Sequence, residues 1–123
     1  PELAKYSPAY LLEIITADPD LVLVARATAS YIGFCISVPD DDLIWLDWYG
    51  VDSAWQRQGV ALALLETHSA IFRTRGVLKI WCDSRTDNMP SRWALQKAGY
   101  REVCTFEQHW YGQDYVILEK LLG

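Results

Sequence analysis

A segment in the middle of the chain, residues 51–61, has the residue types of an anion-binding loop. A strand is expected to end near Val51 and a helix to begin at Gly59, with the small side chain of Ala61 in its first turn. The N–H groups at a helix start and the helix dipole together attract an anion such as a phosphate group. Gly59 allows close approach of the backbone, and Arg57 adds a donor that can pair with phosphate. A tight strand-to-helix turn that binds nothing would show the same pattern.

The elements around this loop follow from hydrophobic periodicity and from turn residues. After Gly59, apolar residues and His68 fall on one helical face, and Gly76 stands where a C-terminal cap is expected. The expected helices cover residues 7–16, 59–75 and 88–97, and the expected strands cover residues 21–27, 30–38, 43–51, 77–82, 101–109 and 115–121. This α-β-β-β-α-β-α-β-β order predicts an α/β fold in which helices cover both faces of a central mixed sheet.

Length and composition indicate one ordered domain over residues 1–123. The chain is 51% hydrophobic and has no low-complexity tract. Its net charge of −5, without a basic stripe, argues against nucleic acid and against an anionic membrane surface as partners. A signal peptide and an apolar run long enough to span a membrane are both missing, so a cytoplasmic location is expected.

The cysteines and the acidic residues give no sign of a metal site. Cys35, Cys82 and Cys104 lack metal-ligand spacing and are expected to be free thiols packed inside strands, which implies a reducing compartment. The acidic residues 40–42 lack the spaced ligands of an EF-hand and are expected to form a solvated turn. We therefore expect no metal.

Several motifs resemble the GNAT superfamily of N-acetyltransferases. Gln56-Arg57-Gln58-Gly59-Val60-Ala61 resembles the Q/R-x-x-G-x-G/A pyrophosphate loop of that family. Asp83-Ser84-Arg85-Thr86-Asp87-Asn88 and Lys97-Ala98-Gly99-Tyr100 are similar to its D-x-R-x-D-N and K-x-G-F/Y elements, and Trp110-Tyr111-Gly112-Gln113-Asp114 is similar to its last hairpin. The similarity runs in the expected order from about Leu21 to Leu121. It implies a GNAT-like, mostly antiparallel central sheet.

The resemblance also implies a site for acetyl-CoA as the acyl donor. The strand before the loop would pair its backbone with the pantetheine arm, and the loop N–H groups would hold the pyrophosphate. The thioester would lie where the strand at 43–51 separates from the strand at 77–82, with its carbonyl polarised by backbone N–H groups. The cofactor-binding residues implied are Tyr49, Gly50, Val51, Gln56, Arg57, Gln58, Gly59, Val60, Ala61 and Asn88.

Proton transfer needs further residues, because an amine attacks a thioester only when it is neutral. Deprotonating a Lys-type amine at pH 7 costs roughly 4 to 5 kcal/mol. Asp47 or Asp83 could offset part of this cost as the general base, although each could instead hold a strand end or a turn. The family's Tyr that protonates the departing thiolate corresponds to Leu95 here, so water or Tyr111 would substitute.

Other polar and aromatic residues are expected to be structural. Arg85 should pair with Asp83 or Asp87, and His68 should be buried with its helix stripe. Of the tryptophans around the strand at 43–51, most are expected in the core and one at the acceptor groove; these are Trp45, Trp48 and Trp55.

Three functions follow from these observations. The leading one is an N-acetyltransferase that moves an acetyl group from acetyl-CoA to an amine, either a small molecule or a protein amino group, by direct attack in a ternary complex. A non-catalytic acyl-CoA-binding or sensing module is the alternative, favoured by Leu95 and the short N-terminus. An α/β domain whose loop binds nothing is the third.

The start of the chain departs from the family pattern. Family members usually begin with a strand and a helix before the helix expected at residues 7–16, and only about six residues precede it here. Either the chain is a fragment, or another protomer covers the sheet edge, since an open edge invites pairing. A homodimer is therefore one arrangement to be expected.

Overall fold

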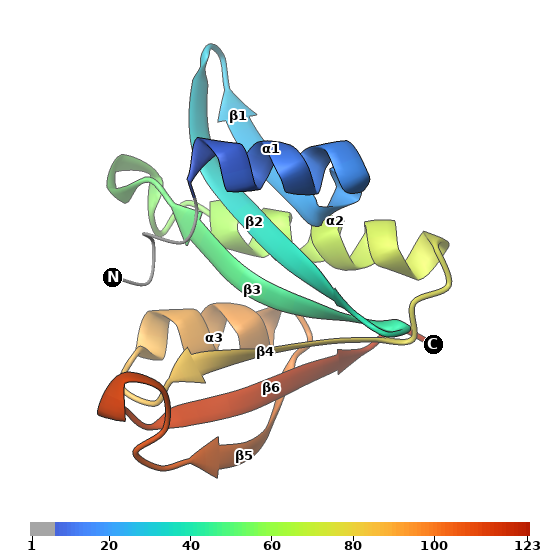
Figure 1. Ribbon diagram of the computed structural model, residues 1–123. Helices are drawn as coiled ribbons and strands as arrows, with labels where there is room; N and C mark the ends of the chain where they lie inside the picture. Colours follow the sequence, from blue (N-terminus) through green and yellow to red (C-terminus); the bar gives the residue numbers. More distant parts are fainter. Residues whose placement is uncertain (1–6) are drawn as a thin grey trace.

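The computed structural model describes residues 7–123, which form one six-stranded sheet and three α-helices (Figure 1). The helices are α1 (Pro8–Ala17), α2 (Val60–Thr74) and α3 (Met89–Lys97). The strands are β1 (Val22–Ala27), β2 (Ser30–Asp40), β3 (Leu43–Val51), β4 (Lys79–Arg85), β5 (Arg101–Phe106) and β6 (Tyr115–Leu121). Their order along the chain is the predicted one, and the prediction about elements before residue 7 lies outside the described residues.

The sheet has the strand order β1-β2-β3-β4-β6-β5 and is mostly antiparallel. β1, β2 and β3 form an antiparallel meander, and β6 pairs antiparallel with both β4 and β5. β3 and β4 are parallel neighbours, and their pairing joins Ile44 to Ile80 and Trp45 to Trp81. Beyond these residues, β3 and β4 no longer pair with each other and diverge (Figure 1). The sheet is therefore split between β3 and β4 toward the C-terminal ends of these strands.

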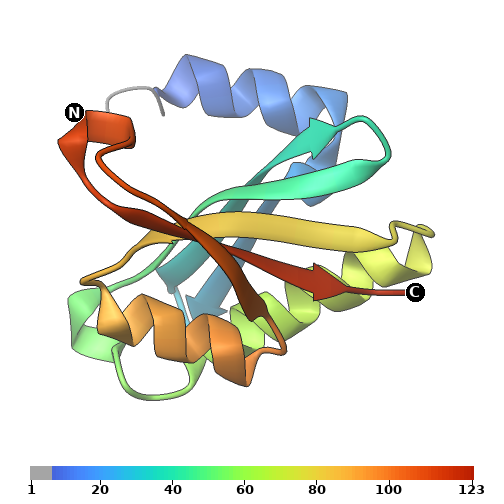
Figure 2. The same ribbon diagram turned by 90° about the horizontal axis from the view of Figure 1, so that it is seen from below.

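Helices cover both faces of the sheet, as predicted. Figure 2 shows α1 on one face and both α2 and α3 on the other. The core lies between the central strands and these two helices, and its fully buried apolar side chains include Leu65, Phe72, Ile80, Leu95 and Leu118. Burial of each such side chain contributes roughly 1.5–3 kcal/mol. This packing fixes α2 and α3 against the strands that border the split.

Caps and glycines set where the helices begin. The Ser7 Oγ accepts a hydrogen bond from the Tyr10 N–H at 3.1 Å and so caps the N-terminus of α1. The Asn88 Oδ1 accepts one from the Ser91 N–H at 3.2 Å and caps α3. Such bonds satisfy N–H groups that a helix leaves unpaired. α2 instead begins after Gly59, which has no side chain, so no side-chain hydrogen bond caps this helix.

An extra residue in β3 changes the face on which its side chains lie. The pairing of β3 with β2 shifts register between Leu46 and Trp48, which leaves Asp47 as a β-bulge. Leu46 before the bulge and Tyr49 after it both pack against the core under the helices. In a regular strand, residues three apart lie on opposite faces. The bulge therefore sets Asp47 and Trp48 side by side between two core-facing positions, at the split.

Several strand boundaries differ from the prediction, such as the end of β4 at Arg85 instead of residue 82, and two of them differ because a turn intervenes. β4 begins two residues later than predicted, since the Val77 N–H is held by the Phe72 C=O at 3.1 Å in the turn that ends α2. β5 ends at Phe106 instead of residue 109, because Gln108 adopts a positive φ of 44°. The Gln108 N–H binds the Asp114 Oδ1 at 2.8 Å, so residues 107–114 close on themselves as a loop.

The turn predicted at residues 39–42 is narrower than expected. β2 continues to Asp40, and Asp41 turns the chain with a φ of 52°. The Asp40 carboxylate is not simply solvated, because its Oδ2 accepts a hydrogen bond from the Trp81 Nε1 at 2.9 Å. This bond ties the β2–β3 hairpin to β4.

The cysteines and His68 lie where the sequence predicts, with one exception. Cys35 and Cys82 are buried free thiols, whereas Cys104 is exposed on the edge strand β5, so the expectation that all three pack inside strands was wrong for it. His68 is buried, and its Nε2 lies 2.5 Å from the Ser37 Oγ.

Candidate functional site

Two neighbouring cavities lie at the split between β3 and β4. The smaller, of about 140 Å³, is lined by these strands and the start of α3. The larger, of about 260 Å³, is lined by the strands and the hairpin that precedes β6. Asp47, Trp48, Asp83 and Tyr115 line both cavities. The carboxylates of Asp47 and Asp83 therefore stand where the two cavities meet.

The smaller cavity has a wall of hydroxyl groups on the helix side of the sheet. The Tyr49 Oη lies 2.7 Å from the Ser91 Oγ, and it also donates to the Ser91 C=O at 3.3 Å. Burial raises the pKa of Tyr49 to about 12, and the hydrogen bond to Ser91 acts in the opposite direction. The phenol is therefore neutral at physiological pH. Asn88 lines the same cavity beside this pair.

The buried thiols near the split are inert. Burial raises the pKa of the Cys82 thiol far above its ordinary value, and the charge of Asp83 adds to this effect. Burial also raises the pKa of Cys35 to about 12. Because the thiolate is the nucleophilic form of cysteine, neither thiol is suited to covalent catalysis.

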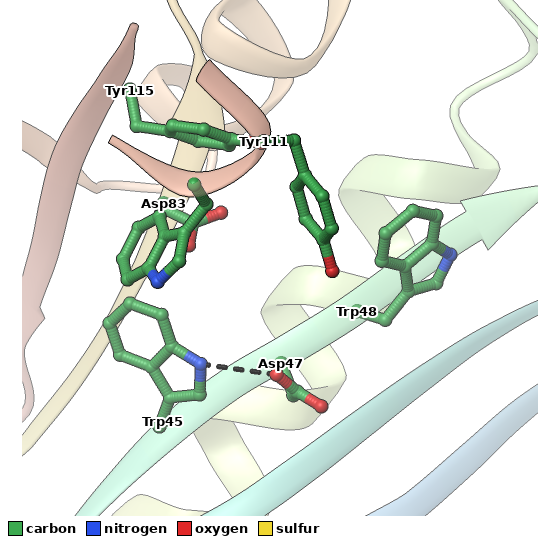
Figure 3. Close-up of a pocket in the computed structure, with 7 residues that line it drawn as sticks. Trp45, Asp47, Trp48, Asp83, Tyr111 and Tyr115 are labelled. Atoms are coloured by element: carbon green, nitrogen blue, oxygen red, sulfur yellow. Dashed lines mark hydrogen bonds between the residues drawn. The ribbon is translucent and has the colours of Figure 1, made fainter. Parts of the chain in front are cut away.

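The larger cavity is an aromatic pocket that contains two carboxylates (Figure 3). Its aromatic lining consists of Trp45, Trp48, Trp110, Tyr111 and Tyr115. The Trp45 Nε1 donates a hydrogen bond to the Asp47 Oδ1 at 3.3 Å. In Figure 3, the hydroxyl end of Tyr111 points toward Asp47 and Trp48 on β3. Aromatic faces and carboxylates both attract cations, so the pocket suits a protonated amine.

The hairpin that closes this pocket is held by ring packing and by the end of β4. The Trp110 ring packs edge-on against Tyr115, with ring centres 5.1 Å apart. The Arg85 Nη2 donates to the Asp87 Oδ2 and to the Gln113 Oε1, both at 3.2 Å. The predicted pairing of Arg85 with Asp87 is thus confirmed, and the bond to Gln113 also joins β4 to the hairpin.

The loop at residues 51–61 has the backbone of a helix N-terminal anion site. Arg57 and Gly59 adopt positive φ angles of 63° and 81°. The first bond within α2 runs from the Ala63 N–H to the Gly59 C=O at 3.0 Å, so helix geometry leaves the N–H groups of residues 60–62 without an intrahelical partner. A Cβ on Gly59 would meet nothing within 4 Å, so its φ angle and not crowding favours glycine there.

The predicted cofactor residues form a path and do not share one cavity. Tyr49 and Asn88 line the smaller cavity, and Gly50 and Val51 continue β3 from it toward the loop. Among the described residues, those at 56–61 line neither cavity. The Gln56 side chain instead donates to the Val51 C=O at 3.3 Å and braces the turn.

Several lining residues were not predicted from the sequence. Both Trp45 and Trp48 line the larger cavity, so the expectation that most of these tryptophans lie in the core was wrong. Ser91 was not singled out at all. The sequence held no signal for the tryptophans, because residues 43–51 are apolar or aromatic at both even and odd positions apart from Asp47 and Gly50.

Within residues 7–123, no group of three or more histidine, cysteine or acidic side chains is arranged to hold a metal ion. The same residues contain no helix long and apolar enough to cross a membrane.

The arrangement of sheet and helices is that of acetyltransferases of known structure. The chain is similar to Ard1 from Thermoplasma volcanium, with a TM-score of 0.84 and 19% identity over 94% of this chain and 80% of that chain. It is also similar to the ribosomal-protein-S18-alanine N-acetyltransferase from Escherichia coli, with a TM-score of 0.77 and 21% identity over 91% of this chain and 76% of that chain. A third structure, the NatC complex bound to Gag peptide and CoA, matches with a TM-score of 0.82 and 16% identity over 96% of this chain and 81% of that chain.

A sequence model described as the Acetyltransferase (GNAT) family matches residues 1–100. The chain therefore belongs to the GNAT acetyltransferase family, and its mixed α/β fold agrees with that assignment. No curated protein sequence matches the chain significantly.

Proposed function

We propose that the protein transfers an acetyl group from acetyl-CoA to an amine by direct attack within a ternary complex. The observation that carries this proposal is the meeting of the two cavities at Asp47 and Asp83. From the smaller cavity, β3 leads through Gly50 and Val51 to the loop before α2, which offers a CoA molecule a path to a helix start. The larger cavity offers aromatic walls and negative charge, as a cationic acceptor requires.

The path from the loop to the split supports acetyl-CoA as the acyl donor. The pyrophosphate would lie on the N–H groups at the start of α2, near Gly59. The pantetheine arm would follow β3 past residues 49–51, and Asn88 would hydrogen-bond it or the amine region. The thioester would then lie between the diverging strands, where backbone N–H groups would polarise its carbonyl.

The reaction would proceed by addition and collapse. The neutral amine nitrogen attacks the thioester carbon, the tetrahedral intermediate collapses, and the C–S bond breaks with its electron pair on sulfur. The proton from the amine passes to Asp83 or Asp47, directly or through water. Either carboxylate offsets part of the roughly 4 to 5 kcal/mol that deprotonating a Lys-type amine costs at pH 7. Tyr111 would shape the acceptor side of the pocket.

A cofactor-binding test comes first. Acetyl-CoA at 100 times its dissociation constant should stabilise the protein by about 2.7 kcal/mol and raise its melting temperature. Gly59→Glu sets a carboxylate where the pyrophosphate would lie and should abolish this increase. Gly76→Glu is the matched control, because Gly76 has nearly the same φ of 80° and equally open surroundings at the far end of α2. Loss of the increase in both variants, or in neither, would contradict a CoA site at Gly59.

A turnover test then separates catalysis from binding. Thiol release from acetyl-CoA would be followed with a panel of small amines, diamines and peptides with a free N-terminus. Asp83→Asn and Asp47→Asn identify the general base, since its loss should lower kcat by about 10²- to 10⁴-fold. The alternative of a non-catalytic acyl-CoA-binding module draws on Leu95, which is fully buried and supplies no acid to the leaving group. Binding without thiol release for every amine would favour that alternative.

A further inference from the structure

The leaving sulfur of a thioester in the split would face the hydroxyl wall of the smaller cavity. Departure of the thiolate builds negative charge on sulfur, and a hydrogen-bond donor aimed at that charge speeds its departure. Position 95 offers only the hydrocarbon of Leu95, which is 0% exposed. The hydroxyl groups on the helix side of this cavity include those of Tyr49 and Ser91, 2.7 Å apart, while the Ser84 hydroxyl donates to the Arg85 C=O at 3.2 Å.

We propose that the Tyr49 hydroxyl is the catalytic group that hydrogen-bonds the departing CoA sulfur, with Ser91 as the residue that positions it. This proposal rests on the proposed acetyl transfer. It gives the side chain of Tyr49 a role distinct from that of its backbone, which would face the pantetheine arm.

The geometry of the pair fits this role. When the Ser91 hydroxyl donates to the Tyr49 Oη, the phenol keeps its own hydrogen for a second acceptor. The bond from Tyr49 to the Ser91 C=O, at 3.3 Å, is beyond the usual range for two oxygen atoms and is readily exchanged for a bond to sulfur. Ser91 is itself fixed at the start of α3, where its N–H binds the Asn88 Oδ1.

The relative acidities of the Tyr49 phenol and the CoA thiol decide whether Tyr49 gives the sulfur a hydrogen bond or a proton. A CoA thiol resembles the cysteine thiol, whose pKa is about 8.5. Burial raises the pKa of Tyr49 to about 12, so the phenol holds its proton more tightly than the thiol does. Tyr49 therefore keeps its proton and stabilises the thiolate. The sulfur then takes up a proton from solvent, and the amine's proton leaves through the carboxylate, so protons balance over the cycle.

The test measures the acidity of CoA bound to the protein, followed by the ultraviolet absorption of the thiolate. A donor to sulfur stabilises the thiolate, so Tyr49→Phe should weaken the acidity of the bound thiol about ten- to hundredfold. With an amine that the wild type accepts, kcat should fall by a similar factor while the dissociation constant of acetyl-CoA stays unchanged. Tyr49→Phe keeps the ring that packs against the core, so the variant should fold.

Tyr100→Phe is the matched control. Tyr100 is also a buried tyrosine, its hydroxyl has no hydrogen-bond partner among the described residues, and it lines neither cavity. Loss of the Tyr100 hydroxyl should leave both the acidity of the bound CoA thiol and kcat unchanged. Ser91→Ala should weaken the thiol's acidity partially, and Ser91→Thr should restore it, which a purely structural role of Ser91 would not do.

The outcomes separate the two proposals. Equal acidity of the bound thiol in the wild type and Tyr49→Phe would overturn the role of Tyr49 and leave acetyl transfer standing. A wild type that does not bind CoA would overturn both.

Discussion

The buried imidazole of His68 makes the stability of this protein depend on pH in a window where few other groups titrate. The side chain is 1% exposed, it contacts Ser37 through Nε2, and its ring packs edge-on against Phe72 with centres 5.0 Å apart. Burial lowers its pKa from 6.5 to about 4, and the positive charge of Lys120 adds to this effect. The folded protein thus keeps His68 neutral at a pH where the unfolded chain has already protonated it.

The sign and size of the effect follow from proton linkage. Above pH 6.5 both states hold a neutral imidazole, and the stability it contributes is fully present. As the pH falls toward 4, the unfolded chain binds a proton that the folded protein excludes, so the free energy of unfolding decreases. With these pKa values, His68 alone should remove about 2 kcal/mol between pH 7 and pH 5.

Urea unfolding at pH 7, 6 and 5 measures this loss. His68→Gln keeps a polar partner for Ser37 but cannot titrate, so its free energy of unfolding should change little over the same range. His109→Gln is the control, because His109 is exposed and is the other of the two histidines in the chain. This variant should lose stability with falling pH as the wild type does.

Carboxylates do not obscure the result. Glu102 has its pKa lowered from an ordinary value of 4.5, mainly by its hydrogen bonds to Arg92, so the stability it contributes is lost below pH 5. A wild type whose stability is constant from pH 7 to pH 5, or a His68→Gln variant with an undiminished pH dependence, would refute the reasoning.

Three further predictions concern stability at pH 7, each measured by urea unfolding. Gly59→Ala should cost about 1–2 kcal/mol, because a Cβ there meets open space and the penalty comes from the positive φ alone; a larger cost would mean that contacts are also lost. Leu95→Ala should cost about 2–5 kcal/mol, since the side chain is fully buried between α3 and the sheet, and a loss under 1 kcal/mol would show that the core closes over the gap. Arg92→Lys should cost about 1–3 kcal/mol, because the guanidinium binds both oxygens of Glu102 at 2.7 and 2.8 Å, and an unchanged stability would show that one bond suffices.

Much of the fold could be predicted because periodicity and turn residues report directly on local structure. The stripe that includes Leu64 and Phe72 defined α2, and the cap expected at Gly76 marked its end. The boundaries that differed depend on contacts between distant residues. The end of β5, for example, is set by the bond from Gln108 to Asp114, which no local pattern reveals.

Site residues could be predicted where the residue type has few structural roles. They could not be predicted where the role depends on which face of the strand the side chain occupies. Gly59 stood out because a glycine between a strand and a helix allows close approach to the backbone, and the structure places it directly before α2 with a φ of 81°. Trp45 and Trp48 suit a core as well as a pocket, so composition alone could not assign them. The bulge at Asp47 decides on which face these side chains lie, and no alternation of polar and apolar residues in the strand reveals it. Ser91 gave no signal, because its contact with Tyr49 joins residues 42 positions apart.

The short pairing between β3 and β4 is the weakest strand boundary of the sheet. The ladder there joins two residue pairs, fewer than at any other strand boundary among residues 7–123, so the two sides are held together mainly by their common core under α2 and α3. A long molecule lying in the split would contact both strands and add a second connection between the two sides. Amide hydrogens of β3 and β4 should then exchange more slowly together when that molecule is bound. Their exchange rates would thus report on the occupancy of a single groove.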